Sequence, residues 1–371
     1  MGWKSFDLTN LTRAPQATFD PAAYLFAQST RHAVYQGFTP AGGSTGRLYE
    51  LYWTPDNDRW RVTDLMSSAD APLATANPTA YVHATTGSQH ILYVGAPFDG
   101  HVHELYWNDD DGWNHHDLTN ATRAPLSLGV PCGYEFHADG TQHVVFQGQD
   151  LHIHELWWRD DGTGWHHGDL NLVAGAPTAD SEPFGYMFDQ QGTQHVVYLG
   201  KDTHIHELWW KATGGWHHND LTVAAGAPPA GGAPTGYVFL DQLTQHVNYR
   251  GVDGHINELW WQASGWQHAN LTQLTGAIPA SSGSVPAGYA FEAQPRQPRA
   301  TQHVLYLGSD GHVHELWWDF TGWHQNDLTA ASNSPASISN PAGFVEVDTA
   351  SQHVYFNSAD HHIVELVWRA A

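Results

Sequence analysis

The side chains with the greatest chemical potential in this chain are histidine, glutamate and tryptophan, and they occur in a fixed order. The stretch TQHVVYLGKDTHIHELWW, residues 193–210, contains three histidines, one glutamate and two tryptophans. Imidazole and carboxylate groups can hold a metal ion or transfer protons, and indole rings can stack on apolar ligand surfaces. Which of these roles applies depends first on whether the stretch is unique.

The stretch is repeated. Related copies occur at residues 30–53, 88–107, 141–158, 193–210, 244–261, 301–318 and 351–368, of which the first and the last are the most divergent. A catalytic site is a single asymmetric constellation, whereas repetition at a regular interval indicates a repeated architecture or multivalent binding.

The histidines could form metal half-sites. Four pairs are spaced i, i+2, which places both rings on one face of a strand: His101/His103, His152/His154, His204/His206 and His312/His314. We find no cysteine or aspartate at a fixed third position of the motif. We therefore predict that these rings hydrogen-bond across strands and pack between repeats, with no metal bound.

The repeated glutamate could take part in glycoside hydrolysis. It occurs once in each copy, as Glu50, Glu104, Glu155, Glu207, Glu258, Glu315 and Glu365. Glycosidases need two carboxylates about 5 to 9 Å apart with different roles. One glutamate in each repeat supplies no such pair, so we expect no catalytic residues, no cofactor and no enzymatic activity.

Each repeat offers four strand-length segments: G-Y-x-F, Q-H-V-x-Y, H-I-H-E-L-W-W and G-W-H-H-x-D-L. They are rich in Val, Ile, Tyr and Trp and are bounded by Gly, Asp and Pro. Three short links favour antiparallel pairing, and a longer Pro-rich link follows. The tryptophan of the last segment falls at positions 3, 60, 113, 165, 216, 266 and 323. This pattern predicts an all-β fold over residues 1–371, one seven-bladed β-propeller domain of four-stranded antiparallel blades, with repeats of roughly 50 residues.

The two ends of the chain are complementary. Residues 2–9, GWKSFDLT, are a fourth segment with no preceding strands, and the last copy ends at ELVWRAA with no fourth segment. We predict that the N-terminal strand completes the last blade and closes the ring.

Composition restricts the possible partners. The formal net charge is −24 with the 28 histidines neutral, so we expect no binding to nucleic acid. No stretch approaches 18 apolar residues, so we expect no membrane insertion. The start of the chain has no apolar signal region. We therefore expect that the protein is made in the cytoplasm and released by a non-standard route.

Strand direction brings the start of T-Q-H-V, the end of E-L-W-W and the start of G-W to one end of each blade. Hydroxyl, amide, carboxylate and indole groups together suit a sugar, whose C–H face stacks on a ring while its hydroxyls bond polar groups. The predicted sugar-binding residues are Ser88, Gln89, Glu104, Trp113, Thr141, Gln142, Glu155, Trp165, Thr193, Gln194, Glu207, Trp216, Thr244, Gln245, Glu258, Trp266, Thr301, Gln302, Glu315 and Trp323.

The repeated tryptophans are not equivalent in this prediction. Those that end the third segment are interpreted as core wedges: Trp158, Trp210, Trp261 and Trp318. Those that follow glycine are interpreted as stacking surfaces. The first blade has Arg31 where other blades have glutamine, and the last has Val367 in place of an aromatic residue. We therefore expect unequal sites, with the second to sixth blades the most complete.

The composite motif QHVxYxG…HIHELWW…GWHHxDLT…AGAP resembles the seven-bladed propeller lectins of the Photorhabdus lectin type, along the whole chain. The resemblance implies a multivalent, non-enzymatic, bacterial lectin for L-fucose, and for galactose or O-methylated sugars, on host glycans. It also implies sites between neighbouring blades and assembly into dimers or tetramers. Cys132, placed in a blade-linking loop, could form an intersubunit disulfide. Two alternatives stay open: a propeller scaffold for protein–protein interaction, and a glycoside hydrolase.

Overall fold

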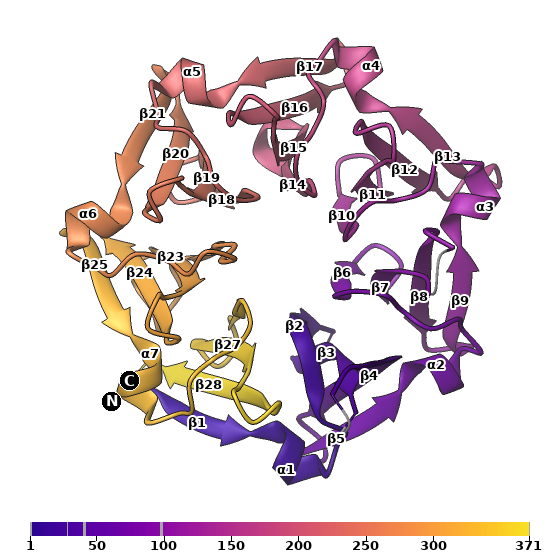
Figure 1. Ribbon diagram of the computed structural model, residues 1–371, viewed down its shortest axis with the longest axis vertical. Coiled ribbons are helices and arrows are strands. Elements are labelled where there is room, and N and C mark those ends of the chain that lie inside the picture. The colour runs from indigo at the N-terminus through magenta and orange to yellow at the C-terminus, as the bar shows by residue number, and fades with distance from the viewer. Residues whose placement is uncertain (1, 28, 40–41, 97–98, 371) are drawn as a thin grey trace.

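The first and last strands of the chain lie side by side and close a ring of seven sheets (Figure 1). The computed structural model describes residues 2–27, 29–39, 42–96 and 99–370. These residues form seven four-stranded antiparallel sheets arranged around one axis. The predicted seven-bladed β-propeller is confirmed.

We number the blades I to VII in chain order. Their strands are β2 (Ala17–Phe26), β3 (Thr30–Phe38), β4 (Ser44–Thr54) and β5 (Arg59–Asp64) in blade I; β6 (Thr79–His83), β7 (Ser88–Val94), β8 (Val102–Asn108) and β9 (Gly112–Asp117) in blade II; β10 (Cys132–Phe136), β11 (Thr141–Gln147), β12 (Ile153–Arg159) and β13 (Gly164–Asp169) in blade III; β14 (Phe184–Phe188), β15 (Thr193–Leu199), β16 (Ile205–Lys211) and β17 (Gly215–Asp220) in blade IV; β18 (Thr235–Phe239), β19 (Thr244–Arg250), β20 (Ile256–Gln262) and β21 (Gly265–Asn270) in blade V; β22 (Ala287–Phe291), β23 (Thr301–Leu307), β24 (Val313–Asp319) and β25 (Gly322–Asp327) in blade VI; and β26 (Ala342–Glu346), β27 (Ser351–Asn357), β28 (Ile363–Arg369) and β1 (Lys4–Asp7) in blade VII.

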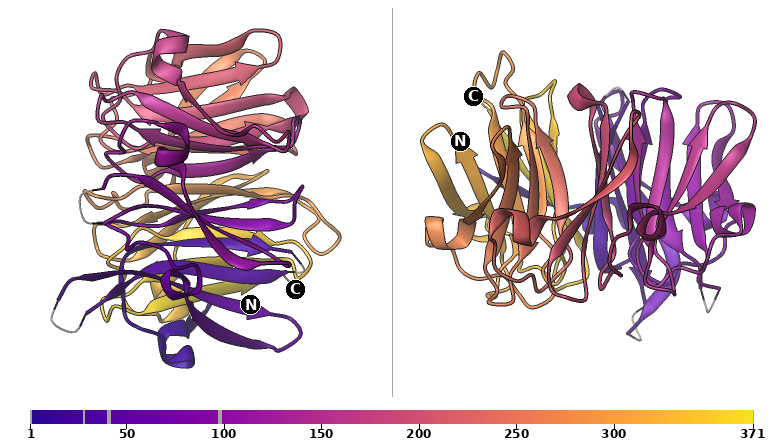
Figure 2. Two further views of the ribbon diagram at one scale, coloured as in Figure 1. Left: turned by 90° about the vertical axis from the view of Figure 1, so that its right-hand side faces the viewer. Right: turned by 90° about the horizontal axis from the view of Figure 1, so that it is seen from above.

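Blade VII is assembled from both ends of the chain. Strand β1 pairs antiparallel with β28, so that Lys4 lies opposite Val367 and Asp7 lies opposite Val364. The predicted closure of the ring by the N-terminal strand is therefore confirmed. In the edge-on views, the strands of each blade run from one face of the ring to the other (Figure 2).

The core lies between blades rather than inside any one of them. Every residue of β15 is buried, because both faces of this strand pack against a neighbouring blade. One apolar cluster joins Tyr186 and Val197 of blade IV to Val247 and Leu259 of blade V, and each of these residues is at most 7% exposed. Burial on both faces explains why the middle of this strand, Val196–Leu199, is a continuous apolar and aromatic run, whereas its first three residues are buried polar groups.

The glycine of the G-Y-x-F segment permits this close approach. A Cβ atom at Gly133 would lie 2.3 Å from the ring of Tyr81 in the preceding blade, and one at Gly185 would lie 2.3 Å from Tyr134. Each tyrosine therefore packs on the backbone of the next blade, which a larger residue than glycine would prevent.

A short helix follows the fourth strand of each blade: α1 (Leu8–Thr12), α2 (Leu65–Ser68), α3 (Leu118–Thr122), α4 (Leu170–Ala174), α5 (Leu221–Ala225), α6 (Leu271–Thr275) and α7 (Leu328–Ser332); a 3-10 turn, η1, covers Asp189–Gln191. The last strand residue caps the helix, as when Asp169 accepts from the backbone N–H of Leu172 at 2.9 Å. Among the described residues, none of these helices has the length and apolarity needed to cross a membrane.

Candidate functional site: cavities between neighbouring blades

A buried chain of hydrogen bonds recurs in every blade. In blade IV, the Thr193 hydroxyl lies 2.8 Å from His195 Nε2, and His195 Nδ1 lies 2.8 Å from Glu207 Oε1. The same two contacts measure 2.7 to 2.8 Å in the other six blades. The repeated hydroxyl, histidine and glutamate of the motif therefore form one unit.

The partners of each histidine fix the role of one ring nitrogen. The glutamate accepts a hydrogen bond from Nδ1–H in either protonation state, and Nε2 accepts from the hydroxyl when the ring is neutral and donates to it when the ring is protonated. Burial raises the pKa of Glu104, but the attraction of His90 and His116 outweighs burial and lowers the pKa to about 2. This carboxylate is therefore ionised at neutral pH and presents acceptor oxygens only.

A tyrosine of the innermost strand joins this unit to the following blade. The Tyr81 ring stacks on His90 with centroids 4.7 Å apart. Its hydroxyl donates to Gln142 of blade III at 2.9 Å. Four further tyrosine–glutamine pairs bridge neighbouring blades at 2.8 to 3.2 Å: Tyr24–Gln89, Tyr134–Gln194, Tyr186–Gln245 and Tyr237–Gln302.

A cavity of about 390 Å³ opens where blades II and III meet. Blade II contributes Ser88, His90, Glu104, Tyr106 and His116, and blade III contributes Gln142, Trp158 and Trp165. Carboxylate, hydroxyl and imidazole groups thus lie on one wall, and two indole rings lie on the other.

The cavity between blades VI and VII, of about 270 Å³, follows the same plan. Its first wall holds Thr301, His303, Glu315 and Trp317, and its second wall holds Gln352, Trp368 and Trp3. The Asn326 amide donates to Glu315 Oε2 at 2.8 Å, so the carboxylate is held at both oxygens.

The predicted site residues do gather at one end of each blade. In blade III, Gln142 lies opposite Trp158, and Trp158 lies opposite Trp165. Their side chains do not all face the same way, because successive strand residues point to opposite faces of the blade. The hydroxyl residue and the glutamate of a blade face the following blade, whereas its glutamine and the tryptophan after glycine face the preceding one.

The twenty predicted residues therefore divide between cavities. Toward the following blade lie Ser88, Glu104, Thr141, Glu155, Thr193, Glu207, Thr244, Glu258, Thr301 and Glu315; toward the preceding blade lie Gln89, Trp113, Gln142, Trp165, Gln194, Trp216, Gln245, Trp266, Gln302 and Trp323.

Sequence reasoning missed part of the cavity wall. His90 and Tyr106 line the II/III cavity, and neither was among the predicted residues. Trp158, interpreted as a core wedge, is half-buried and lines this cavity beside Trp165. The alternation of side chains along a strand was the signal that could have found them, since Trp158 and Trp165 are directly paired.

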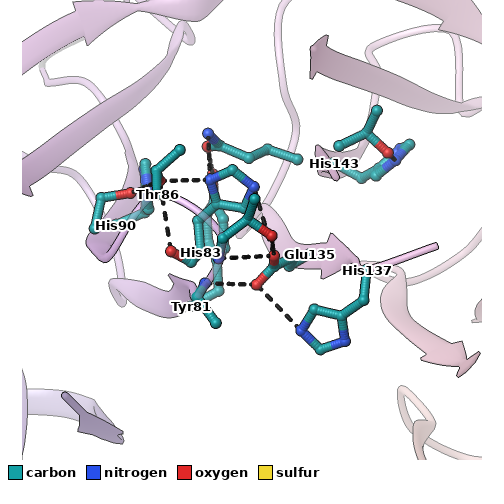
Figure 3. Close-up of polar contacts among 12 residues, drawn as sticks. Tyr81, His83, Thr86, His90, Glu135, His137 and His143 are labelled. Carbon is teal, nitrogen blue, oxygen red and sulfur yellow. Dashed lines mark hydrogen bonds and ion pairs between the residues drawn. The ribbon is translucent and has the colours of Figure 1, made fainter. Parts of the chain in front are cut away.

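A further chain of hydrogen bonds leads from the II/III cavity to His83 and Glu135 (Figure 3). His83 stands at the strand position that is phenylalanine in blades III, IV and V. Its Nδ1 lies 2.7 Å from the Thr86 hydroxyl, which lies 2.7 Å from the Ser88 hydroxyl. The Ser88 hydroxyl lies 2.7 Å from His90, so a continuous chain runs from His83 into the cavity.

Glu135 of blade III anchors the outer end of this chain. Its carboxylate accepts from the backbone N–H of Ala84 at 2.6 Å and lies 3.6 Å from His83. His137 lies 3.2 Å from Glu135 and 2.7 Å from Asp189. Burial lowers the pKa of His137, but the hydrogen bond and charge of Asp189, with the charge of Glu135, raise it overall.

The i, i+2 histidine pairs lie at the opposite end of the blades. The statement that no aspartate recurs beside them was wrong: ligand atoms of Asp310, His312, His314 and Asp327 lie within 4.8 Å of one another, and similar groups occur in blades II, III and IV. Each carboxylate has a protein partner, as in the 2.8 Å contact between His312 Nδ1 and Asp327. In blade I, Arg47 replaces this histidine and pairs with Asp64. The histidine and aspartate side chains therefore connect the third strand of the blade to the aspartate that caps the following helix.

Cys132 is the first residue of β10 and does not lie in a loop as expected. Its sulfur lies 3.4 Å from the backbone nitrogen of Gly185 in blade IV. Burial raises the pKa of the thiol to about 11, which keeps it protonated and unreactive.

Solved structures share this architecture. BP39L lectin from Burkholderia pseudomallei matches with a TM-score of 0.67 and 14% identity, over 96% of this chain and 97% of that one. SapL1 lectin in complex with alpha methyl fucoside matches with a TM-score of 0.54 and 19% identity, over 79% and 92%. The six-bladed lectin of Aleuria aurantia, described with a novel fucose recognition mode, matches with a TM-score of 0.51 and 15% identity, over 78% and 90%.

The chain shares the β-propeller fold of these lectins. The similarity lies in the fold, because identity is below one residue in five for all three. The Aleuria lectin has one blade fewer and aligns with only 78% of this chain. No protein-family model matches the chain, and no curated protein sequence matches it.

Proposed function

We propose that this protein is a multivalent lectin that binds neutral sugars, L-fucose first among them, in the cavities between its blades. The observation that carries this proposal is the composition of the cavity walls. An ionised glutamate and a histidine face two indole rings across the II/III cavity, and the VI/VII cavity repeats the arrangement. Galactose and O-methylated sugars on host glycans are secondary candidates.

The walls of the II/III cavity match the two kinds of surface of a sugar. A pyranose has an apolar C–H face that can stack on Trp165, and hydroxyl groups that can donate to the carboxylate of Glu104. The histidine holds one carboxylate oxygen in place, so the carboxylate is oriented before a sugar arrives. Such preorganisation lowers the entropic cost of binding. Three fold neighbours are lectins, and two are described with a fucose ligand or fucose recognition.

The two alternatives receive less support from the cavities. The II/III and VI/VII cavities are each lined by a single carboxylate, Glu104 or Glu315, which supplies no acid–base pair for glycoside hydrolysis. A scaffold for one protein partner does not need the same recessed polar group at successive interfaces. We therefore propose a protein without enzymatic activity.

Calorimetric titration with methyl α-L-fucoside tests the proposal. We expect more than one sugar bound per chain, and we expect Trp165→Ala to reduce the stoichiometry by one because it removes the stacking surface of the II/III cavity only. Leu172→Ala is the matched control, since Leu172 is 73% exposed on α4 at the other end of the blade. Absence of heat from fucose, galactose and a wider glycan array would overturn the lectin proposal.

Assembly into dimers or tetramers, bacterial origin with a role at a host surface, and release by a non-standard route stay predictions. An oligomer would add avidity, because one glycan-bearing surface could engage several cavities at once.

A further inference from the structure

The cavity between blades VII and I is larger than the II/III and VI/VII cavities. It measures about 580 Å³, against about 390 Å³ at II/III and about 270 Å³ at VI/VII. Val367 lines it at the strand position where blade VI has Trp317 and blade II has Tyr106. Loss of that aromatic ring opens the first wall of the cavity.

Two further replacements at this interface occur together. Arg31 of blade I occupies the position that is glutamine in the other blades. Phe344 of blade VII occupies the position that is tyrosine in the innermost strand of the other blades. A guanidinium has donors only and could not accept the tyrosine hydroxyl that glutamine accepts. Phe344 has no hydroxyl, so it needs no acceptor on Arg31.

The Arg31 guanidinium is only partly satisfied by the protein. The residue is 6% exposed, its Nη1 donates to Glu365 at 3.1 Å, and its guanidinium carbon lies 3.9 Å from the centre of the Trp53 ring. Its buried Nε–H has no acceptor in the described part of the chain, and the nearest carboxylate oxygen, on Glu346, is 4.0 Å away. Nε itself has almost no exposed surface, but the guanidinium lines the cavity, so a ligand can meet this cation along the edge that faces the cavity.

The cavity also concentrates positive charge. The chain has 14 lysine and arginine residues, and four of them line this one cavity: Lys4, Arg31, Arg59 and Arg369. The carboxylates that line it are Asp58 and Glu365, and Arg31 also lies 4.0 Å from Glu346, so four cations face three carboxylates and the balance stays positive. The II/III and VI/VII cavities are lined by no lysine or arginine and by one glutamate each. A net positive cavity in a chain of formal charge −24 selects for anions.

We propose that the VII/I cavity binds an acidic saccharide, a sugar residue that carries a carboxylate or a sulfate group. Arg31 meets the anionic group with its free donors, Trp60 offers a ring for the sugar face, and Lys4, Arg59 and Arg369 attract the ligand at the wall. The saccharide part of this inference rests on the proposed lectin function. It gives one cavity a ligand class different from that of the other cavities.

Calorimetric titration at low salt tests the inference with three probes: the methyl glycoside of N-acetylneuraminic acid, methyl glucuronide and galactose 6-sulfate. We expect at least one acidic probe to bind at one site per chain. The carboxylate and sulfate arms identify which anion is preferred. The affinity is expected to fall several-fold between 20 and 150 mM salt, because neighbouring charges are screened.

Two variants locate the site. Arg31→Gln, which restores the residue found in the other blades, is expected to weaken acidic-probe binding at least tenfold. The double change R59Q/R369Q, away from the buried pair, is expected to weaken it several-fold without altering the core. The matched control is Lys201→Gln, which removes an exposed cation from a turn at the other end of blade IV and is expected to change nothing.

The outcomes separate the two proposals. If no acidic probe binds, or if Arg31→Gln and R59Q/R369Q both leave binding unchanged, the inference is overturned while methyl α-L-fucoside binding still stands. If acidic probes bind at one site and fucoside does not bind, only the neutral-sugar proposal fails. Loss of acidic-probe binding in Trp165→Ala would place the anion in the II/III cavity and would also overturn the inference.

Discussion

The hydroxyl of Tyr81 donates to Gln142 Oε1 at 2.9 Å and lies 3.0 Å from Glu104 Oε1, so one group contacts both walls of the II/III cavity. The glutamate belongs to blade II and the glutamine to blade III. The packing of neighbouring blades and the shape of the cavity therefore depend on the same contact.

Tyr81→Phe is expected to lower stability and to weaken sugar binding at the II/III cavity. It leaves the buried Gln142 carbonyl without its donor, which costs about 1 to 3 kcal/mol. Thermal unfolding and fucoside titration would show both effects. Phe344 occupies the equivalent position in blade VII, so the variant should fold; an unchanged melting temperature would show that this hydrogen bond does not hold the blades together.

Glu207→Gln is expected to remove one fucoside site per chain, at the interface between blades IV and V. Glu207 accepts from His195 through one oxygen and from Asn219 through the other, each at 2.8 Å. The amide places an NH₂ group against one of these donors and lacks the charge that attracts sugar hydroxyls. Asn219→Ala is the control, since it keeps the carboxylate and should retain the site with weaker affinity. An unchanged stoichiometry in Glu207→Gln would exclude this carboxylate from binding.

Stability is expected to fall as the pH drops below about 6.5, and His167→Gln should reduce that loss. Burial, and then the charge of His154, lowers the pKa of His167. The unfolded chain therefore takes up a proton near its ordinary pKa, about 6.5, that the folded chain does not take up. Blade VI carries Gln325 at this position, so the change fits the fold. Melting temperatures at pH 7.5 and 5.5 measure the effect; an equal drop in wild type and variant would contradict it.

Cys132→Ser is expected to leave the migration of the protein on a non-reducing gel unchanged. The thiol packs against Gly185, and its pKa of about 11 leaves almost no thiolate at neutral pH. An intersubunit disulfide would compete with the contact between the thiol and the backbone of Gly185. A dimer band that disappears in the variant would show that the thiol does reach a second chain.

The sequence repeat was sufficient to predict the fold, because each blade follows the same pattern and the unmatched segments at the two ends fit together. The residue types of the cavities were also predictable. The repeat alone did not predict which residues of neighbouring blades face each other. Glu104 of blade II and Trp165 of blade III line one cavity because the two blades pack side by side in the ring. The contact between His83 and Glu135 could not be predicted either. The two residues are 52 positions apart in the chain, and neither belongs to the repeated motif.

Closure of the ring has a numerical consequence. Each cavity takes one wall from each of two blades, so an open row of blades would have one complete cavity fewer than it has blades. The pairing of β1 with β28 supplies the missing one, between blades VII and I. Two of its lining residues, Arg31 and Val367, depart from the repeat. A single repeat therefore has no complete cavity of its own, and a cavity of this kind needs two neighbouring repeats.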